Sequence, residues 1–411
     1  MANSKQDWEI KTLEEVCDFY NGLWKGKKLP FETVNVIRNT NFTKEGQLDD
    51  SDIAVLDVEE KQFQKRQLKY GDIILEKSGG GPKQPVGRVI IFNKKDGKYS
   101  FSNFTSVIRV NDSSKLDFIY LHKLLHHLYI SGYTEKLQKH TTGIRNLDFT
   151  EYKKLEVPLP PITEQKRIVG ILNEKFGTIE ELKKITERQI VDAKELFESE
   201  VSEIFSEHYE QEEKLPLSEM TSLITKGSSP KWQGIKYVKE GEGVLFVTSK
   251  NVGIGTLLME NATYLEKRFN EIQKRSILQH GDVLTNIVGA SIGRTAIYNL
   301  EKVANTNQAV CIMRCNEKLQ NQFLVYLLNS KYFIEILHAN EVNNARANLS
   351  LAFFSNLEIP ALPIDKQIEI IKKLDELSEK TKELEAIFRR KIADLEELKK
   401  SYLEQAFSGN L

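Results

Sequence analysis

The chain contains few residue groups whose types and spacing could support catalysis. The glycine-rich loop at residues 79–83 comes nearest to a nucleotide-binding motif, but its Lys83 is not followed by Ser or Thr and the Walker spacing is absent. Asp72 and Asp282 recur in equivalent contexts, each after a glycine at the start of a predicted strand. That position is typical of a turn residue, so neither Asp is expected to be catalytic.

Cysteines and histidines are the remaining candidates for metal or redox chemistry. Cys311 and Cys315 fall on one face of a strand-like run without a matching His pair, so we expect them to be buried as small apolar groups. His122, His126 and His127 lie on an apolar helix, where ordinary packing is expected. We therefore predict a non-enzymatic binding protein that has no catalytic residue, metal or cofactor in this chain.

The elements that position these residues form an internal repeat. The segment 146–206 recurs 202 positions later, so that Asn146 corresponds to Asn348. The junction Leu-Glu-Val-Pro at residues 155–158 returns as Leu-Glu-Ile-Pro at 357–360. The apolar residues that follow keep the same register: Leu172/Leu374, Leu182/Leu384, Ile185/Ile387, Leu196/Leu398 and Phe205/Phe407. A period this long exceeds that of a solenoid, so it predicts one two-part module used twice.

Two long helices are predicted at residues 163–208 and 365–407. Each follows a proline signal, begins with a plausible N-cap (Thr163 or Asp365) and then lacks proline. The second helix shows an apolar stripe at three/four spacing, typical of a coiled coil: Ile370, Leu374, Leu377, Leu384, Phe388, Leu395, Leu398 and Tyr402. Antiparallel pairing of the helices returns the chain to the first domain, whereas the alternative is that each helix packs on its own domain.

The globular halves are related more loosely. Gly-Asp-Ile-Ile-Leu at 71–75 corresponds to Gly-Asp-Val-Leu-Thr at 281–285, and Val-Gly-Arg at 86–88 to Ile-Gly-Arg at 292–294. We predict an α+β protein: two mixed α/β domains joined by two long antiparallel coiled-coil helices, with a pseudo-two-fold repeat. The predicted segments are 1–158, 159–208, 209–360 and 361–411.

Composition is compatible with this organisation. The 411 residues include 58 Lys+Arg and 59 Asp+Glu, which excludes a wholly cationic protein, and the three cysteines form no paired framework. No apolar stretch predicts a signal peptide or a membrane span. We expect a cytoplasmic protein without a membrane partner.

These features resemble the specificity (S) subunit of type I restriction–modification enzymes, over nearly the whole chain. The most specific signals are the Leu-Glu-[Val/Ile]-Pro…Pro-Ile-x-x-Gln junction into each long helix and the closing run Leu-Glu-Gln-Ala-Phe-Ser-Gly-Asn-Leu at 403–411. One departure is Asp-Lys-Gln at 365–367, where the first junction keeps Thr-Glu-Gln at 163–165.

The resemblance implies a non-catalytic subunit with two target-recognition domains, each recognising half of an asymmetric bipartite sequence in double-stranded DNA. The helix pair would set the gap and dock two modification (methyltransferase) subunits. Restriction subunits that translocate and cut DNA would complete the assembly. S-adenosylmethionine, ATP and Mg would then belong to the partner subunits, and a methylation-only system is also compatible.

Base-edge readout needs Arg, Lys, Asn, Gln, Ser or Thr on loops that reach the major groove. The candidates in the first domain are Lys77, Ser78, Lys83, Gln84, Thr141, Thr142 and Arg145. Those in the second domain are Thr285, Asn286, Ser291, Asn343, Asn344 and Arg346. Two further loops, 24–28 and 226–232 with Lys226 and Lys231, are expected to hold phosphates.

Two alternatives stay open on the sequence alone. A coiled-coil adaptor whose domains bind proteins would explain the helices but not the duplicated domains with divergent loops. A self-sufficient DNA-modifying enzyme would need an S-adenosylmethionine pocket and an Asn/Asp-Pro-Pro-aromatic motif, and neither is found in the sequence.

Overall fold

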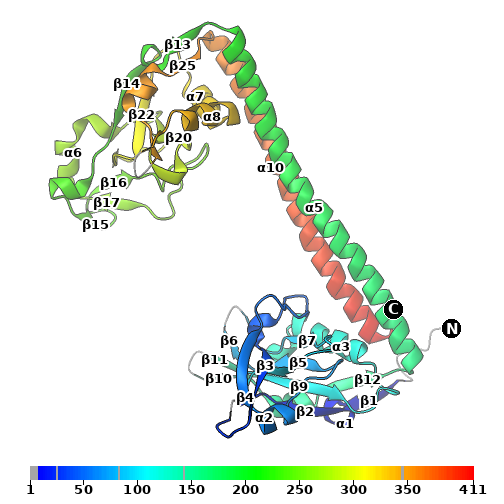
Figure 1. Cartoon of the computed structure of the whole chain (residues 1–411). Coiled ribbons are helices and arrows are strands. Elements are labelled where there is room, and N and C mark those ends of the chain that lie inside the picture. The colour runs from blue at the N-terminus through cyan, green and yellow to red at the C-terminus, as the bar shows by residue number, and fades with distance from the viewer. Residues whose placement is uncertain (1–7, 25, 82–83, 142–143, 344–346) are drawn as a thin grey trace. The chain divides into compact units, whose positions relative to one another are not determined.

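The computed structural model describes residues 8–24, 26–81, 84–141, 144–343 and 347–411 (Figure 1). They divide into two compact units: unit 1 comprises residues 1–186 and 390–411, and unit 2 comprises residues 187–389. Each unit therefore holds one globular domain and a part of each long helix. The main elements recur in the same order in both units, as the internal repeat predicts.

The unit 1 domain is built on an antiparallel sheet with the order β2-β9-β5-β7. Its strands are β2 (Cys17–Asn21), β9 (Thr105–Val110), β5 (Ile73–Glu76) and β7 (Val89–Ile91). Because side chains alternate along a strand, Ile73 and Leu75 join the core beneath helix α3 (Phe118–Ile130), whereas Ile74 joins the core on the opposite face. Strands of a second sheet close that opposite core: β4 (Ala54–Glu59), β3 (Phe31–Ile37) and β8 (Tyr99–Phe101).

The unit 2 domain repeats this plan. Its central sheet has the order β14-β22-β19-β20, with β14 (Thr221–Lys226), β22 (Val310–Cys315), β19 (Val283–Asn286) and β20 (Thr295–Ile297). Its second sheet contains β15 (Tyr237–Val238), β17 (Thr263–Leu265), β16 (Val244–Val247), β21 (Ala304–Thr306) and β18 (Ile277–Leu278). Helices α7 (Asn321–Asn329) and α8 (Lys331–Ala339) occupy the place of α3.

Shorter elements complete both domains. In unit 1 they are β1 (Glu9–Thr12), α1 (Leu13–Val16), α2 (Glu60–Lys65), α4 (Phe149–Lys153) and β12 (Glu156–Leu159). In unit 2 they are β13 (Lys214–Pro216), α6 (Arg268–Ile272), α9 (Leu351–Asn356) and β25 (Glu358–Pro360). The pairs β1–β12 and β13–β25 lead directly into the two long helices.

Asp72 and Asp282, the repeated Gly-Asp residues, hold the central sheets together. The Asp72 carboxylate accepts the backbone N–H of Lys69 at 2.7 Å, which confirms the predicted turn. It also binds Arg109 of β9 through two hydrogen bonds of 2.7 Å. Asp282 binds Arg314 of β22 in the same way, at 2.7 and 2.9 Å. Both carboxylates are about 1 % exposed or less, so each forms a buried bidentate ion pair.

Two buried glutamines explain the repeated junction motif. Gln165 accepts the backbone N–H of Asp117, the N-cap of α3, at 2.8 Å and donates to the carbonyls of Lys115 and Pro160, also at 2.8 Å. Gln367 makes the equivalent three bonds at the start of α7, all 2.8 Å long. Both side chains are fully buried. Each glutamine therefore fixes the start of a long helix to its own globular domain.

The long helices are α5 (Ile162–Gln211) and α10 (Ile364–Ser408), and they pair antiparallel within each unit. In unit 1, Lys183 of α5 binds Glu396 of α10 at 2.7 Å, and Lys399 of α10 binds Glu180 at 3.2 Å. The end of α10 packs on the first domain, where Phe407 lies 5.4 Å from the Tyr120 ring.

The same pairing is found in unit 2. Lys194 of α5 binds Glu385 of α10 at 3.3 Å, and Lys373 of α10 binds Glu200 at 2.8 Å. The repeated residue Phe205 lies 5.3 Å from Phe323 of α7. The predicted antiparallel helix pair is thus confirmed in both units, against the alternative in which each helix packs only on its own domain.

Two details of the predicted helices are wrong. The helices begin at Ile162 and Ile364, so Thr163 and Asp365 lie in the first turn and are not N-caps. Leu384 and Leu398, assigned to the pairing stripe, are 44 % and 41 % exposed. The stripe contained more apolar positions than one helix interface can bury, and the contact side is set by packing in three dimensions. Among the described helices, none combines the length and apolarity needed to cross a membrane.

Candidate nucleic-acid interface

A small sheet in unit 1 brings together the two segments predicted to read DNA. Strand β11 (Ile144–Leu147) pairs with β10 (Gln138–Thr141) on one side and with β6 (Ser78–Gly80) on the other (Figure 1). Arg145 lies opposite Gly80, and the backbone of Thr141 lies opposite Ile144. The predicted residues around positions 78 and 145 therefore share one surface region although they are far apart in sequence.

Lys77 and Ser78 are partly engaged within unit 1. The Lys77 ammonium donates to Asn21 Oδ1 at 2.9 Å, and burial lowers the pKa of this lysine. The Ser78 hydroxyl donates to Asn146 Oδ1 at 2.5 Å. The backbone N–H groups of both residues donate to the carbonyl of Phe104, at 3.0 and 3.2 Å. These bonds fix the position of the loop, so that its remaining donors are presented from a rigid base.

Gln84 and Arg145 are the more available donors of this region. Gln84 is exposed and closes a tight turn, since its backbone N–H donates to the Gly81 carbonyl at 3.1 Å. Arg145 is partly exposed, and within the described ranges no carboxylate forms an ion pair with it. Lys83 and Thr142 lie outside the described residues.

Unit 2 brings the equivalent segments together. Val288 forms a bridge with Asn348 of β24 (Ala347–Asn348), beside the 3₁₀ turn Gly289–Ser291. The predicted residue Ser291 is partly exposed in that turn. Asn343 belongs to β23 (Val342–Asn343), which pairs with β24. Asn344 and Arg346 lie outside the described residues.

Thr285 and Asn286 require a correction, because both side chains are fully buried and are out of reach of a base. Thr285 Oγ1 lies 2.8 Å from Thr295 Oγ1 on the neighbouring strand. The Asn286 amide donates to the Ser249 carbonyl at 2.9 Å. Alignment with the first domain placed both residues next to the loop. The sequence alone could not show that β19 extends through them.

Lys226 ends β14, and Lys231 lies in the segment that follows, which has a counterpart in unit 1. Each loop starts at a glycine that touches a backbone carbonyl: a Cβ on Gly22 would lie 1.8 Å from Ser102 O, and one on Gly227 1.8 Å from Thr306 O. Lys226 and Lys231 are exposed, as the prediction of phosphate contacts requires.

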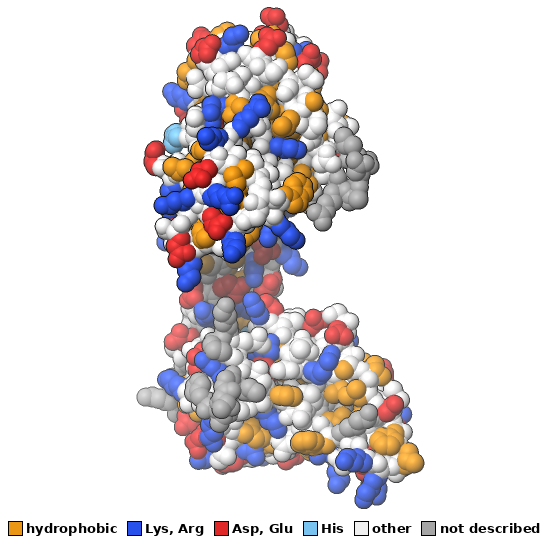
Figure 2. All heavy atoms as spheres, turned by 90° about the vertical axis from the view of Figure 1, so that its left-hand side faces the viewer, with side chains coloured by type: hydrophobic (Ala, Val, Ile, Leu, Met, Phe, Trp, Pro, Cys, Tyr) orange, Lys and Arg blue, Asp and Glu red, His pale blue; other side chains and the backbone are white. Residues whose placement is uncertain are grey.

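Exposed aromatic side chains accompany these loops. Trp24 is 66 % exposed and Trp232 is 80 % exposed, and Phe104 beside the Ser78 loop is 45 % exposed. On one face of unit 2, the upper body in Figure 2, Lys and Arg side chains lie among hydrophobic ones, with Asp and Glu side chains interspersed. The two Trp loops were predicted from the sequence, whereas Phe104 was not. An aromatic residue inside a polar loop was the available signal, because a folded domain would otherwise bury it.

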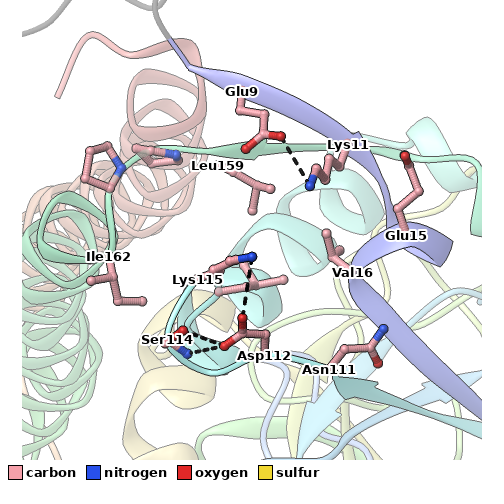
Figure 3. A pocket seen from close by; sticks show the side chains of 13 residues that line it. Glu9, Lys11, Glu15, Val16, Asn111, Asp112, Ser114, Lys115, Leu159 and Ile162 are labelled. Carbon is pink, nitrogen blue, oxygen red and sulfur yellow. Dashed lines mark hydrogen bonds and ion pairs between the residues drawn. The ribbon is translucent and has the colours of Figure 1, made fainter.

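A hollow of about 420 Å³ lies beside the start of α5 in unit 1 (Figure 3). Four of its charged residues are already paired with each other, Lys11 with Glu9 at 3.2 Å and Lys115 with Asp112 at 3.8 Å, and the Glu15 carboxylate accepts the Thr12 hydroxyl at 2.7 Å. In the part of the chain that the structure describes, no group of three or more His, Cys, Asp or Glu side chains could hold a metal ion. Burial raises the pKa of the Cys311 thiol to about 12, which makes it a poor nucleophile.

Comparison with known proteins agrees with the assignment of these loops to a DNA-binding protein. The family model described as the type I restriction modification DNA specificity domain matches residues 5–190 and 231–394, most of both units. A putative type I restriction enzyme MjaX specificity subunit from Methanocaldococcus jannaschii is 25 % identical over 99 % of the chain and 94 % of its own length. The EcoBI specificity subunit from Escherichia coli is 22 % identical over 69 % of the chain and 64 % of its own length.

Solved structures share the fold. A chain from a study of the assembly and conformational transition of the type I R-M system has a TM-score of 0.69 at 19 % identity and covers 98 % of both chains. The HsdS subunit from Thermoanaerobacter tengcongensis has a TM-score of 0.58 at 20 % identity, over 98 % of this chain and 97 % of that one. The α+β fold with two long helices is therefore confirmed, and nothing in these comparisons supports the adaptor alternative.

Proposed function

The chain belongs to the type I restriction–modification DNA specificity family, and on that premise we propose that it selects an asymmetric bipartite target in double-stranded DNA. Residues 1–158 and 209–360 are the recognition domains, one for each half-site. Residues 159–208 and 361–411 are the spacers that set the gap. The chain itself is non-catalytic and acts in the cytoplasm, while methylation and cleavage belong to partner subunits that use S-adenosylmethionine, ATP and Mg.

The observation that carries this proposal is a constant scaffold with different loops. The buried ion pairs Asp72–Arg109 and Asp282–Arg314 are alike in both units, as are the bonds made by the junction glutamine. The loops that follow β5 and β19 differ: one forms strand β6 and the other a 3₁₀ turn. A shared scaffold gives two similar approaches to a duplex, and unlike loops give two different half-sites.

The proposed DNA contacts are the polar side chains of the loops described above. In unit 1 they are the available donors Gln84 and Arg145 and the partly engaged Lys77 and Ser78, together with the predicted Lys83, Thr141 and Thr142. In unit 2 they are Lys226, Lys231 and Ser291, together with the predicted Asn343, Asn344 and Arg346. Thr285 and Asn286 support the loop from inside and are not proposed as contacts.

Exposed apolar residues on the helix pair support the docking of two modification subunits. Those in unit 1 are Leu182, Ile185 and Leu398, which are 38 %, 48 % and 41 % exposed. Their repeat counterparts in unit 2 are Leu384, Ile387 and Leu196, which are 44 %, 59 % and 69 % exposed. Each unit thus presents the same set of three, and exposed apolar groups of this kind mark interaction surfaces. Two copies of one partner fit two equal sets, and restriction subunits join the same complex.

Footprinting tests this function directly. The chain is co-purified with its methyltransferase subunit and bound to DNA that carries the target and to DNA with either half-site scrambled. We expect two separated protected segments on the target, with protection lost when either half is scrambled. One continuous segment, or protection that ignores sequence, would contradict the proposal.

A further inference from the structure

The arginine of the Val-Gly-Arg motif, Arg88, is bound within the unit 1 interior. Arg88 donates to the carbonyls of Asn39 and Phe42, both at 3.0 Å. Its guanidinium also binds Glu76 through two hydrogen bonds, of 2.8 and 3.0 Å. The Glu76 side chain is 1 % exposed and that of Arg88 is 11 % exposed. Arg88 is therefore a structural group that closes the loop above the sheet.

In unit 2 an asparagine replaces this arrangement. The amide of Asn286 donates directly to the carbonyls of Ser249 and Val252, at 2.9 and 3.3 Å. It also donates to the Ser291 hydroxyl at 3.2 Å. Those two carbonyls therefore receive their donor from Asn286, and no arginine is needed to satisfy them.

The carbonyls bound in unit 1 and those bound in unit 2 belong to equivalent turns. In unit 1, Asn41 Oδ1 accepts the backbone N–H of Arg38 at 2.9 Å. In unit 2, Asn251 Oδ1 accepts the backbone N–H of Thr248 at 2.9 Å. Asn41 lies between Asn39 and Phe42 in the sequence, as Asn251 lies between Ser249 and Val252. The turns are therefore equivalent.

The donors are equivalent as well. Glu76 ends β5 and its backbone N–H donates to the Arg88 carbonyl at 2.8 Å. Asn286 ends β19 and its backbone N–H donates to the Arg294 carbonyl at 2.9 Å. Position 286 thus corresponds to 76, and position 294 to 88. The exchange of Glu for Asn moves the bonding of the turn from the arginine to the asparagine.

Because of this exchange, the Arg294 side chain does not make the hydrogen bonds that Arg88 makes in unit 1. It is exposed, and in the part of the chain that the structure describes it makes no side-chain hydrogen bond or ion pair. Its backbone is fixed, because its N–H donates to the Ser291 carbonyl at 3.2 Å and the next residue, Thr295, is held on both sides by Asn329. A guanidinium with five uncommitted donors, carried on a fixed backbone, suits bidentate recognition of a base edge or phosphate.

We propose that Arg294 reads the half-site recognised by unit 2, and that its repeat counterpart Arg88 takes no part in readout. The inference rests on the proposed function, since it assigns a specificity-determining residue within the same interface. Arg294 lies in the loop that contains Ser291 and that contacts β24, so it belongs to the region already argued to face DNA. A base-edge contact through two acceptors, as a guanine offers, matches the geometry of the guanidinium.

The test uses the complex with the methyltransferase subunit and the target found by methylation mapping. Affinity is measured for target DNA and for DNA scrambled only in the unit 2 half-site. Arg294→Ala removes the reader, Arg294→Lys keeps the charge but not the fork, and Asn286→Glu rebuilds the unit 1 arrangement that captures the arginine. Arg275→Ala removes the same charge from another exposed position and measures the general charge effect.

We expect Arg294→Ala to lower affinity for the target roughly ten- to hundredfold, with little effect on the scrambled DNA. Asn286→Glu should lower it similarly while thermal unfolding stays intact, and Arg294→Lys should recover only part of the loss. Unchanged discrimination by Arg294→Ala, or equal losses on both DNAs, would overturn the inference even if Asn286→Glu fails to fold. If the wild-type complex does not discriminate between the DNAs, the proposed function itself is refuted.

Discussion

Removal of the junction glutamine should loosen one unit and leave the other unchanged. Gln165 is fully buried, and its side chain makes three hydrogen bonds of 2.8 Å. Gln165→Ala leaves the backbone N–H of Asp117 and two carbonyls without partners. An unsatisfied buried group costs roughly 1–3 kcal/mol, and three groups lose their partner, so we expect a loss of about 3–5 kcal/mol.

Hydrogen exchange resolves this effect by unit. Exchange at the first turn of α3 should accelerate about a hundredfold or more, because each 1.4 kcal/mol is a factor of ten. Gln367→Ala should have the same effect at the first turn of α7 and none at α3. Gln405→Ala, an exposed residue on α10, is the matched control and should change stability by less than about 0.5 kcal/mol. Equal acceleration in both units by Gln165→Ala, or none in either, would show that Gln165 does not hold the start of α5 to the first domain.

Three further predictions concern stability, docking and pH. Asp282→Asn leaves the partly buried Arg314 without its counter-charge and should destabilise unit 2 by about 2–4 kcal/mol in urea unfolding; a loss below about 0.5 kcal/mol would show that the pair is dispensable. Ile185→Glu with Ile387→Glu should leave the fold intact, since both residues are exposed, but should abolish co-purification of the methyltransferase subunit; undiminished binding would place the docking surface elsewhere. Burial lowers the pKa of His126 to about 3, below its unfolded value of about 6.5, so the unfolded state binds the extra proton and unit 1 should lose stability as pH falls below about 6.5. Hydrogen exchange in α7 of unit 2, which contains no histidine, is the internal control. Equal loss of stability in both units would contradict this assignment.

The sequence predicted the architecture because the repeat carries it directly. The two long helices and their antiparallel pairing follow from the repeated junction and the need of an apolar stripe for a partner. The repeated Asp72 and Asp282 were also placed correctly in turns. Their ion pairs with Arg109 and Arg314 were not predicted, because these partners lie on a neighbouring strand and no local spacing connects them.

The site was less predictable because the burial of a side chain depends on tertiary packing. Thr285 and Asn286 have polar side chains next to a loop, yet the sheet extends through them and buries both. Leu182 in unit 1 and its repeat counterpart Leu384 in unit 2 are both exposed on the helix pair, which only the packed helices reveal. The different roles of Arg88 and Arg294 were hidden for the same reason: both arginines follow a glycine in nearly the same motif, and the residue that decides is the Glu or Asn at the end of the preceding strand.

Adenine-methylation mapping tests whether this chain sets the DNA specificity of methylation. A genome that carries this chain and its neighbouring methyltransferase gene is compared with one that lacks only this chain. We predict that deletion removes methylation at one asymmetric bipartite motif, whose two halves and gap the map then gives. Methylation of that motif that persists without the chain would contradict this prediction.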